Sequence, residues 1–216
     1  MSTQATHKFA VLLDGDVTPS PYLSAELAGR KIIAADGGIR HAQPLNVTPD
    51  LWVGDFDSSE QALLTKYAEI ERRDFPAEKA FSDGELAINE GIHWGAKDIL
   101  LVGALGGRRG DHILFHLTKA LALAKSGIQI TLTDGVQIAT PLLAGSQILP
   151  FQEDEMTFSI VGFSELEGVT IEGAKWPLEA VKVMLGSTLT LSNVGGRNTT
   201  ISVEKGDSFL FTQLRI

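Results

Sequence analysis

Two acidic residues in the segment WVGDFDSSE raise the first question about chemistry in this 216-residue chain. Asp55 and Asp57 stand two positions apart, directly after an apolar run and just before a helix-like segment. Two nearby carboxylates raise each other's pKa unless a cation neutralises them. A divalent ion would resolve this repulsion, and Mg²⁺ commonly binds one or two carboxylates together with substrate phosphates. The competing interpretation is that Asp57 begins a helix cap with Ser58 while Asp55 is solvated.

Two further polar segments are expected at the same edge of a sheet, ADGG at 35–38 and FSDGE at 81–85. In open α/β sheets, ligands gather at the carboxyl ends of the strands, because the loops there converge on a crevice. The bare glycine amides of ADGG would let a nucleotide approach closely, with Asp36 holding a ribose, a base or a metal; a simple turn is the alternative. Lys79 would suit a polyphosphate, while Asp83 suits both a ligand role and a helix cap.

The glycine-rich segment GALGGRRGDH could carry a backbone loop around a phosphate, with an arginine forked onto its oxygens. It is not a Walker loop, because the Gly-Lys-Ser/Thr ending is missing, and it does not satisfy the Rossmann fingerprint. His112 and His116 lie one helical turn apart without the glutamate of an HExxH motif, which favours surface or packing roles over a zinc site. Covalent acyl chemistry has no support, since no serine lies in a nucleophile-elbow pattern.

The elements that must position these residues follow from the apolar pattern. Short apolar runs at 8–13, 31–36, 51–55, 98–104 and 128–134 predict strands, and helix-period segments at 58–70, 82–95 and 111–127 lie between them. This alternation predicts a mostly parallel sheet covered by helices on both faces. After about residue 135, short runs separated by glycine, among them 187–193, predict an antiparallel sandwich or barrel. We therefore expect an α/β nucleotide-binding domain at 1–140 and a smaller all-β sandwich domain at 141–216.

Composition excludes several classes of protein. The formal charge of −9 argues against a general nucleic-acid or membrane-surface binder, which would carry a basic face. Without cysteine there is no disulfide framework and no thiolate metal site, which fits a reducing cytosol. The N-terminus lacks the features of a signal peptide, and no apolar run approaches the ~18 residues of a membrane span. The expectation is a cytoplasmic protein without nucleic-acid or membrane partners.

Taken in order, AADGG, NVTPDLWVGDFDS, EKAFSDGELAI and GALGGRRGDH resemble the motif series of the thiamine pyrophosphokinases. GAKWPL followed by STLTLSN is similar to the small β domain of that family, so the resemblance spans essentially the whole chain. It implies a Mg²⁺-dependent transfer of pyrophosphate from ATP to the hydroxyl of thiamine, with release of AMP. It also implies a homodimer that binds thiamine between its subunits.

The resemblance carries the family's roles onto matching positions of this chain. The metal and catalytic carboxylates it implies are Asp55, Asp57 and Asp83. The residues it places around the nucleotide are Gly15, Asp36, Gly37, Gly38 and Lys79. Those it places near the phosphates are Arg108 or Arg109, Asp111 as a further catalytic residue, and His112. The thiamine contacts it implies are Trp176, Ser192 and Asn193.

The chain departs from the family pattern at two points. Ala80 stands where the family commonly has an acidic residue, and Ser82 replaces a threonine. One extra residue lies between Gly107 and Asp111, which leaves open which arginine meets the phosphates. Three alternatives therefore remain: a pyrophosphokinase for another acceptor such as a pterin alcohol, a thiamine or nucleotide sensor with impaired catalysis, and a metal-dependent nucleotide-sugar transferase.

Overall fold

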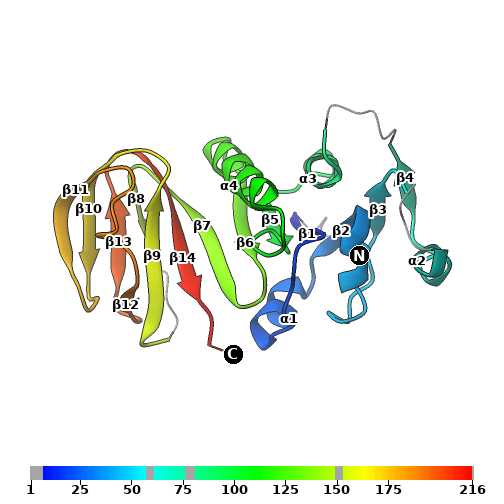
Figure 1. The fold of residues 1–216 in the computed structure, drawn as a ribbon, viewed down its shortest axis with the longest axis horizontal. Coiled ribbons are helices and arrows are strands. Elements are labelled where there is room, and N and C mark those ends of the chain that lie inside the picture. Colours follow the sequence, from blue (N-terminus) through cyan, green and yellow to red (C-terminus); the bar gives the residue numbers. More distant parts are fainter. Residues whose placement is uncertain (1–6, 57–60, 76–80, 149–152, 216) are drawn as a thin grey trace, which may run out of the picture. The chain divides into compact units, whose positions relative to one another are not determined.

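The computed structural model describes residues 7–56, 61–75, 81–148 and 153–215. The described residues divide into two compact units (Figure 1). The first unit contains the chain up to Lys119 together with Gly127–Gly135, and the second contains Ala120–Ser126 and the chain from Val136 onward.

The first unit is built on a parallel sheet. Its strands are β1 (Lys8–Leu12), β2 (Lys31–Ala35), β3 (Leu51–Gly54), β4 (Arg72–Asp74), β5 (Asp98–Val102) and β6 (Gln129–Thr133). They lie in the order β6-β5-β1-β2-β3-β4, and every neighbouring pair is parallel. The strands β1, β2 and β5 each contain four consecutive buried residues, as expected where both faces of a parallel sheet are covered.

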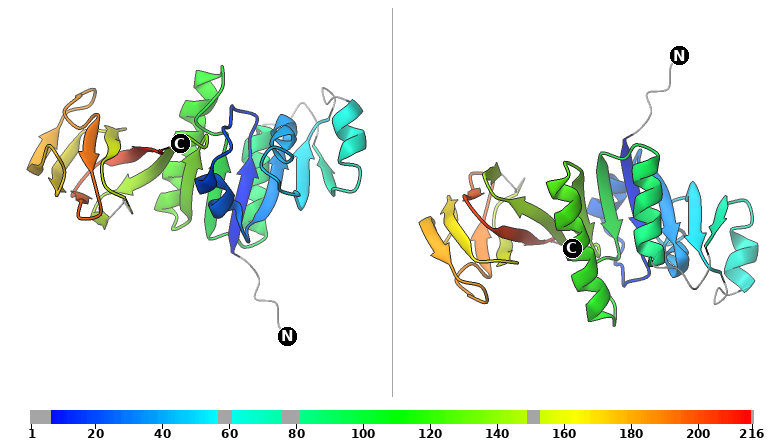
Figure 2. Two further views of the ribbon diagram at one scale, coloured as in Figure 1. Left: turned by 90° about the horizontal axis from the view of Figure 1, so that it is seen from below. Right: turned by 90° about the horizontal axis from the view of Figure 1, so that it is seen from above.

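Helices cover both faces of this sheet. Helix α1 (Pro21–Leu27) buries Leu23 and Leu27 in the cluster that contains Ala10 and Leu12 of β1. On the other face, Gly91 of helix α3 (Asp83–His93) lies against Phe9 of β1. Figure 2 shows α1, in blue, and α3, in blue-green, on opposite sides of the strands. The remaining helices are η1 (Asp36–His41), α2 (Gln61–Lys66) and α4 (Gly110–Lys125).

The chain reverses its direction of travel across the sheet beside β1. From β1 it proceeds through β2 and β3 to β4 on one side, and then returns through α3 to β5 on the other side of β1. Loops that leave neighbouring strands in opposite directions leave a crevice between them at the carboxyl ends of the strands. The order of the strands therefore places the loops after β1 and β5 at a topological switch point.

The second unit consists of antiparallel strands. These are β7 (Gln137–Leu143), β8 (Ser146–Ile148), β9 (Met156–Gly162), β10 (Leu166–Glu172), β11 (Leu178–Val183), β12 (Asn193–Gly195), β13 (Thr200–Val203) and β14 (Asp207–Gln213). Four of these strands are neighbours in the order β12-β9-β14-β7, and the other four form a sheet of their own in the order β11-β10-β13-β8. Apolar side chains from both sheets, such as Phe158 of β9 and Ile171 of β10, form one core. The predicted fold class, a helix-covered parallel sheet followed by an all-β sandwich, is confirmed.

The structure corrects the predicted strand at 187–193. The chain runs through turns there, and strand β12 begins at Asn193. The Thr190 hydroxyl donates to the Ile160 carbonyl at 2.7 Å, and the Leu191 amide donates to the Thr188 carbonyl at 3.1 Å, which closes a turn. Leu189 and Leu191 are consequently exposed, although their alternation with polar residues resembles that of a half-buried strand.

The remaining differences concern short or polar elements. Helix α2 ends at Lys66, short of the predicted end at 70, and its predicted start and cap at Ser58 lie outside the described residues. Strand β4 has the sequence RRD, which carries no apolar signal. None of the helices in the described ranges is both long enough and apolar enough to cross a membrane.

Candidate active site

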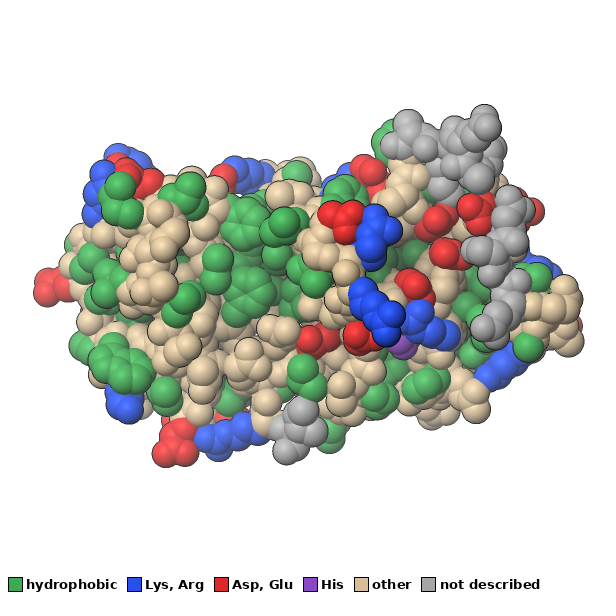
Figure 3. Space-filling model, viewed as in Figure 1, with side chains coloured by type: hydrophobic (Ala, Val, Ile, Leu, Met, Phe, Trp, Pro, Cys, Tyr) green, Lys and Arg blue, Asp and Glu red, His purple; other side chains and the backbone are tan. Residues whose placement is uncertain are grey.

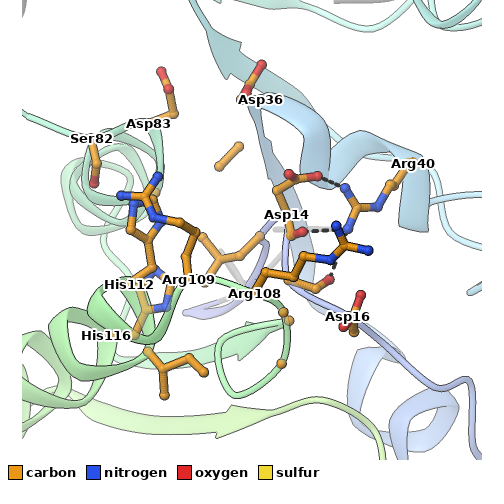
Figure 4. Close-up of a pocket in the computed structure, with 18 residues that line it drawn as sticks. Asp14, Asp16, Asp36, Arg40, Ser82, Asp83, Arg108, Arg109, His112 and His116 are labelled. Atoms are coloured by element: carbon orange, nitrogen blue, oxygen red, sulfur yellow. Dashed lines mark hydrogen bonds and ion pairs between the residues drawn. The ribbon is translucent and has the colours of Figure 1, made fainter.

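A pocket of about 470 Å³ opens in the first unit at the carboxyl ends of β1, β2 and β5. The charged and histidine side chains that line it are Asp14, Asp16, Asp36, Asp83, Arg40, Arg108, Arg109, His112 and His116 (Figure 4). They come from the loops after the three strands, from η1, and from the N-terminal halves of α3 and α4. Figure 3 shows charged side chains of both signs gathered over this unit. Arginines can bind phosphate oxygens and carboxylates can bind a cation, so the lining suits an anion accompanied by a metal ion.

Asp36 takes its place at the pocket through an unusual backbone conformation. It directly follows β2 and has a φ of 44°, a region that residues other than glycine rarely adopt. The Trp52 indole, fully buried beneath it, donates from Nε1 to the Asp36 carbonyl at 2.9 Å. This hydrogen bond holds the strained turn that directs Asp36 to the pocket.

The two glycines after Asp36 are required by the protein's own packing. A Cβ on Gly38 would lie 2.1 Å from the Leu12 carbonyl oxygen, and one on Gly37 would lie 2.3 Å from the Asp14 carboxylate. Neither glycine is among the described residues that line the pocket. The lack of side chains at Gly37 and Gly38 therefore lets η1 pack against the end of β1. The predicted contact of these two glycines with a nucleotide stays a prediction.

The loop after β1 is fixed by glycines in a second loop. A Cβ on Gly15 would lie 2.0 Å from the Gly103 carbonyl oxygen and 2.5 Å from that of Gly106. Both loops line the pocket, as does Gly15 itself. The glycine-rich segment after β5 thus supports the pocket by allowing main chain to contact main chain.

Arg40 joins η1 to the loop after β1. Its guanidinium donates to the Asp14 carboxylate and to the Asp14 carbonyl (Figure 4). The neighbouring His41 bonds through Nε2 to the Gly15 carbonyl at 2.8 Å, which makes Nε2 the protonated nitrogen. These contacts orient the backbone of residues 14 and 15 toward the pocket.

The segment GGRRGDH leads into helix α4. Arg108 and Arg109 both line the pocket, and Arg109 donates to both carboxylate oxygens of Asp111 at 2.9 and 2.6 Å. This pairing lowers the pKa of the exposed Asp111 carboxyl. Asp111 is not among the described lining residues, whereas His112 is. The structure therefore brings both arginines to the pocket, and the catalytic role of Asp111 stays a prediction.

Asp83 stands in the first turn of α3 and lines the pocket. The preceding Ser82 caps the helix by accepting a hydrogen bond from the Glu85 amide at 3.3 Å. The Glu85 side chain pairs with Lys119 of α4 at 2.8 Å. Ser82 thus provides the helix cap, so Asp83 is not needed for that role. Its position at the pocket is compatible with binding a ligand.

The other predicted acidic and basic residues are described in part. Asp55 follows β3 and is half-buried, but it is not among the described lining residues. Asp57 and Lys79 lie outside the described residues. Within the described ranges, no three acidic or histidine side chains form a group that could hold a metal ion. The predicted Asp55, Asp57 and Asp83 metal site therefore stays a prediction.

The predicted thiamine contacts lie together in the second unit. Trp176 is 52% exposed, and its backbone is joined to the buried side chain of Asn193. The adjacent Lys175 ammonium lies 4.5 Å from the centroid of the Trp176 ring. Ser192 is exposed beside them, with its amide donating to the Ser159 hydroxyl at 2.9 Å. An exposed indole on a fixed backbone suits a stacking surface and is not the core tryptophan of a sandwich.

Sequence reasoning did not select Asp14, Asp16 or Arg40 as site residues. The pair Asp14 and Asp16 repeats the spacing of Asp55 and Asp57 after a buried strand, so the same reasoning could have found it. Arg40 left no comparable signal. His116, assigned to surface or packing, is 8% exposed and lines the pocket, with a pKa lowered by burial.

Acidification should destabilise the protein partly through His41. Burial, together with the nearby Arg40, lowers the pKa of this histidine. Below its unfolded pKa of about 6.5, the unfolded chain takes up a proton that the folded chain does not, so stability falls as pH drops from there through the folded pKa. We expect His41→Gln to lose less unfolding free energy than the parent between pH 7 and pH 5, measured by denaturant titration. Parallel losses in the two proteins would contradict this assignment.

The protein combines an α/β domain, which has a polar pocket at its topological switch point, with a β-sandwich domain. This combination identifies the class of protein as a two-domain protein with a ligand site in its α/β domain. The family model for the catalytic domain of thiamin pyrophosphokinase matches residues 27–132, and that for its vitamin B1 binding domain matches residues 146–206. The chain belongs to the thiamine pyrophosphokinase family. Both matches fall in the order expected from the sequence motifs.

Individual relatives agree with this assignment. The chain is 29% identical over 165 residues to the thiamine pyrophosphokinase of Bacillus subtilis strain 168, covering 74% of this chain and 76% of the relative. The crystal structure of the B. subtilis thiamine pyrophosphokinase aligns with a TM-score of 0.83 at 22% identity over 97% of this chain and all of that chain. Thiamin pyrophosphokinase from Candida albicans aligns with a TM-score of 0.82 at 15% identity, covering 97% and 90% of the two chains. These structures share the fold of this chain.

Proposed function

We propose that this protein is a thiamine diphosphokinase that transfers pyrophosphate from ATP to the hydroxyl of thiamine. The thiamine oxygen forms a bond to the β-phosphorus of ATP, the bond from that phosphorus to the oxygen of the α-phosphate breaks, and AMP leaves. The observation that carries the proposal is the match of both family domains in one chain, with a pocket of mixed charge in the first of them.

The pocket lining provides the groups that a triphosphate requires. Positioning and charge neutralisation account for most catalysis of phosphoryl transfer, because charge spreads over the nonbridging oxygens in the transition state. Arg108 and Arg109 line the pocket as exposed cations, and Arg40 is a third. We assign the two arginines after β5 to the phosphates and Asp36 to the nucleoside.

A divalent cation is compatible with the donor set. Four aspartates from three segments line the pocket, and carboxylates are the hard oxygen ligands that Mg²⁺ prefers. Mg²⁺ commonly binds one or two carboxylates together with substrate phosphates. We assign it to Asp55, Asp57 and Asp83. When bound, such an ion neutralises charge on the polyphosphate.

The second unit supplies the acceptor site in this proposal. Trp176 would stack on a ring of thiamine, with Ser192 beside it. We further propose a homodimer that binds thiamine between its subunits. The family relation supports this dimer. So do the large apolar side chains that are exposed in this unit, which are Trp176, Met184, Leu185, Leu189 and Leu191.

The direct test is to incubate the protein with ATP, Mg²⁺ and thiamine and to measure AMP by chromatography. We expect equal amounts of AMP and thiamine diphosphate, with none when thiamine is omitted. A pterin alcohol replaces thiamine as the matched control acceptor and should release no AMP above background. AMP release with the pterin alone, or binding of thiamine without turnover, would contradict the proposed activity.

A further inference from the structure

The carboxamide of Asn193 is engaged by the backbone of Trp176. Its Oδ1 accepts from the Trp176 amide at 3.1 Å, and its Nδ2 donates to the Trp176 carbonyl at 2.7 Å. Both backbone groups of one residue are thus bound by one side chain, as a neighbouring strand would bind them. Asn193 is 4% exposed, so these bonds lie within the folded protein.

The oxygen of this carboxamide has no acceptor capacity left for a ligand. Oδ1 also accepts from the Val194 amide at 2.8 Å, and a carbonyl oxygen has two lone pairs. The same segment holds the turn at two further points: the Lys175 amide donates to the Val194 carbonyl at 2.8 Å, and the Thr199 hydroxyl to the Gly173 carbonyl at 3.0 Å. The turn 173–176 is therefore held along its length by residues 193–199.

The fixed backbone contrasts with the exposed indole. Half of the Trp176 side chain is accessible, although its main chain is held by a buried amide. An indole that projects from such a support loses little conformational freedom when it binds a flat ligand, because the backbone is already ordered.

From this arrangement we infer that Asn193 is a positioning residue, which supports thiamine binding by holding the backbone of Trp176 and not by contacting the vitamin. The inference deepens the proposed function and rests on the assignment of Trp176 to the thiamine site. Asn193→Asp is the sharpest variant, because it keeps the acceptor oxygen but places a carboxylate oxygen against the Trp176 carbonyl. Asn193→Ser, which keeps one hydrogen-bonding group, is the milder second variant.

In a steady-state assay, we expect Asn193→Asp to raise the KM for thiamine about tenfold or more, with kcat and the KM for ATP changed less than about twofold. Asn193→Ser should fall between this variant and the parent. Thr199→Val is the matched control, because it removes both hydrogen bonds of a buried hydroxyl, one to the Gly173 carbonyl in the same turn and one from the Gly196 amide, and leaves the Trp176 contacts in place. It should keep the KM for thiamine within about twofold. An unchanged KM in both Asn193 variants, or an equal rise in the control, would overturn the inference.

A double-mutant cycle separates positioning from direct contact. In a Trp176→Ala background, Asn193→Asp should raise the KM for thiamine no further if Asn193 acts through the indole. A second, multiplicative rise would mean that Asn193 contacts the ligand itself and would overturn the inference.

A ligand-free readout distinguishes this inference from the proposed function. With fluorotryptophan incorporated, the ¹⁹F resonance of Trp176, assigned with Trp176→Phe, should shift or broaden in Asn193→Asp and not in Thr199→Val. An unchanged resonance would overturn the positioning role even if the enzyme turns over. Absence of turnover in the parent would contradict the proposed function and leave the ¹⁹F result standing.

Discussion

Asp83→Asn should lower thiamine-dependent AMP release by about a thousandfold or more, equivalent to ~4 kcal/mol of transition-state stabilisation. Asp83 lines the pocket from the first turn of α3. The amide that replaces it has nearly the same shape but cannot neutralise a bound cation. The variant should remain folded, because the cap of α3 is provided by Ser82. The measurement is steady-state AMP release together with a thermal unfolding curve.

Glu90→Gln is the matched control for Asp83→Asn. It also removes one negative charge from α3, but Glu90 lies outside the described pocket lining and pairs with Arg73. We expect turnover within about twofold of the parent and a stability loss of ~1 kcal/mol or less, since Arg73 is partly exposed. A similar loss of turnover in both variants would show that turnover depends on the total charge of α3. It would contradict a specific role for Asp83.

Gly15→Ala should destabilise the protein by about 3 kcal/mol or more, at the upper end of the usual cost of overpacking. The added Cβ would lie 2.0 Å from the Gly103 carbonyl oxygen and 2.5 Å from that of Gly106. These are main-chain atoms, so relief requires a movement of the loops that line the pocket. Denaturant unfolding would measure the loss, and AMP release by the folded fraction should fall as well.

Gly110→Ala provides the control for this substitution. Gly110 is the first residue of α4, and a Cβ there would meet no atom within 4 Å. We expect unchanged or slightly higher stability, by ~0.5 kcal/mol, because alanine restricts the unfolded chain and favours the helix. If Gly15→Ala proved as stable as Gly110→Ala, the close crossing of the loops after β1 and β5 would be contradicted.

The sequence predicted the parallel sheet well because its strands are apolar and continuous. The run at 98–104 contains β5, and the run at 8–13 contains β1. Their burial on both faces leaves a strong signal in the residue types. Strand β4 left none, since it is polar and its order comes from pairing with β3. The strand predicted at 187–193 failed for the opposite reason: its alternation is real, but the chain forms a turn in which the Leu191 amide donates to the Thr188 carbonyl.

The candidate site could be located from the sequence but not completed. The carboxyl ends of the strands were predicted to meet at one crevice, and Asp36, Asp83, Arg108, Arg109 and His112 do line one pocket. The contribution of Arg40 depends on how η1 packs against β1, which residue types do not reveal. The hydrogen bonds between Asn193 and Trp176 join residues 17 positions apart, and the chain just before Asn193 follows a path that differs from the predicted strand.

The Lys175 ammonium has a consequence for which ring can occupy the surface of Trp176. Its charge lies over the indole, 4.5 Å from the ring centroid. It would repel a positively charged heterocycle that approaches this tryptophan, whereas a neutral ring would not be repelled. Of the two rings of a vitamin such as thiamine, the uncharged pyrimidine is therefore the better electrostatic match for this tryptophan.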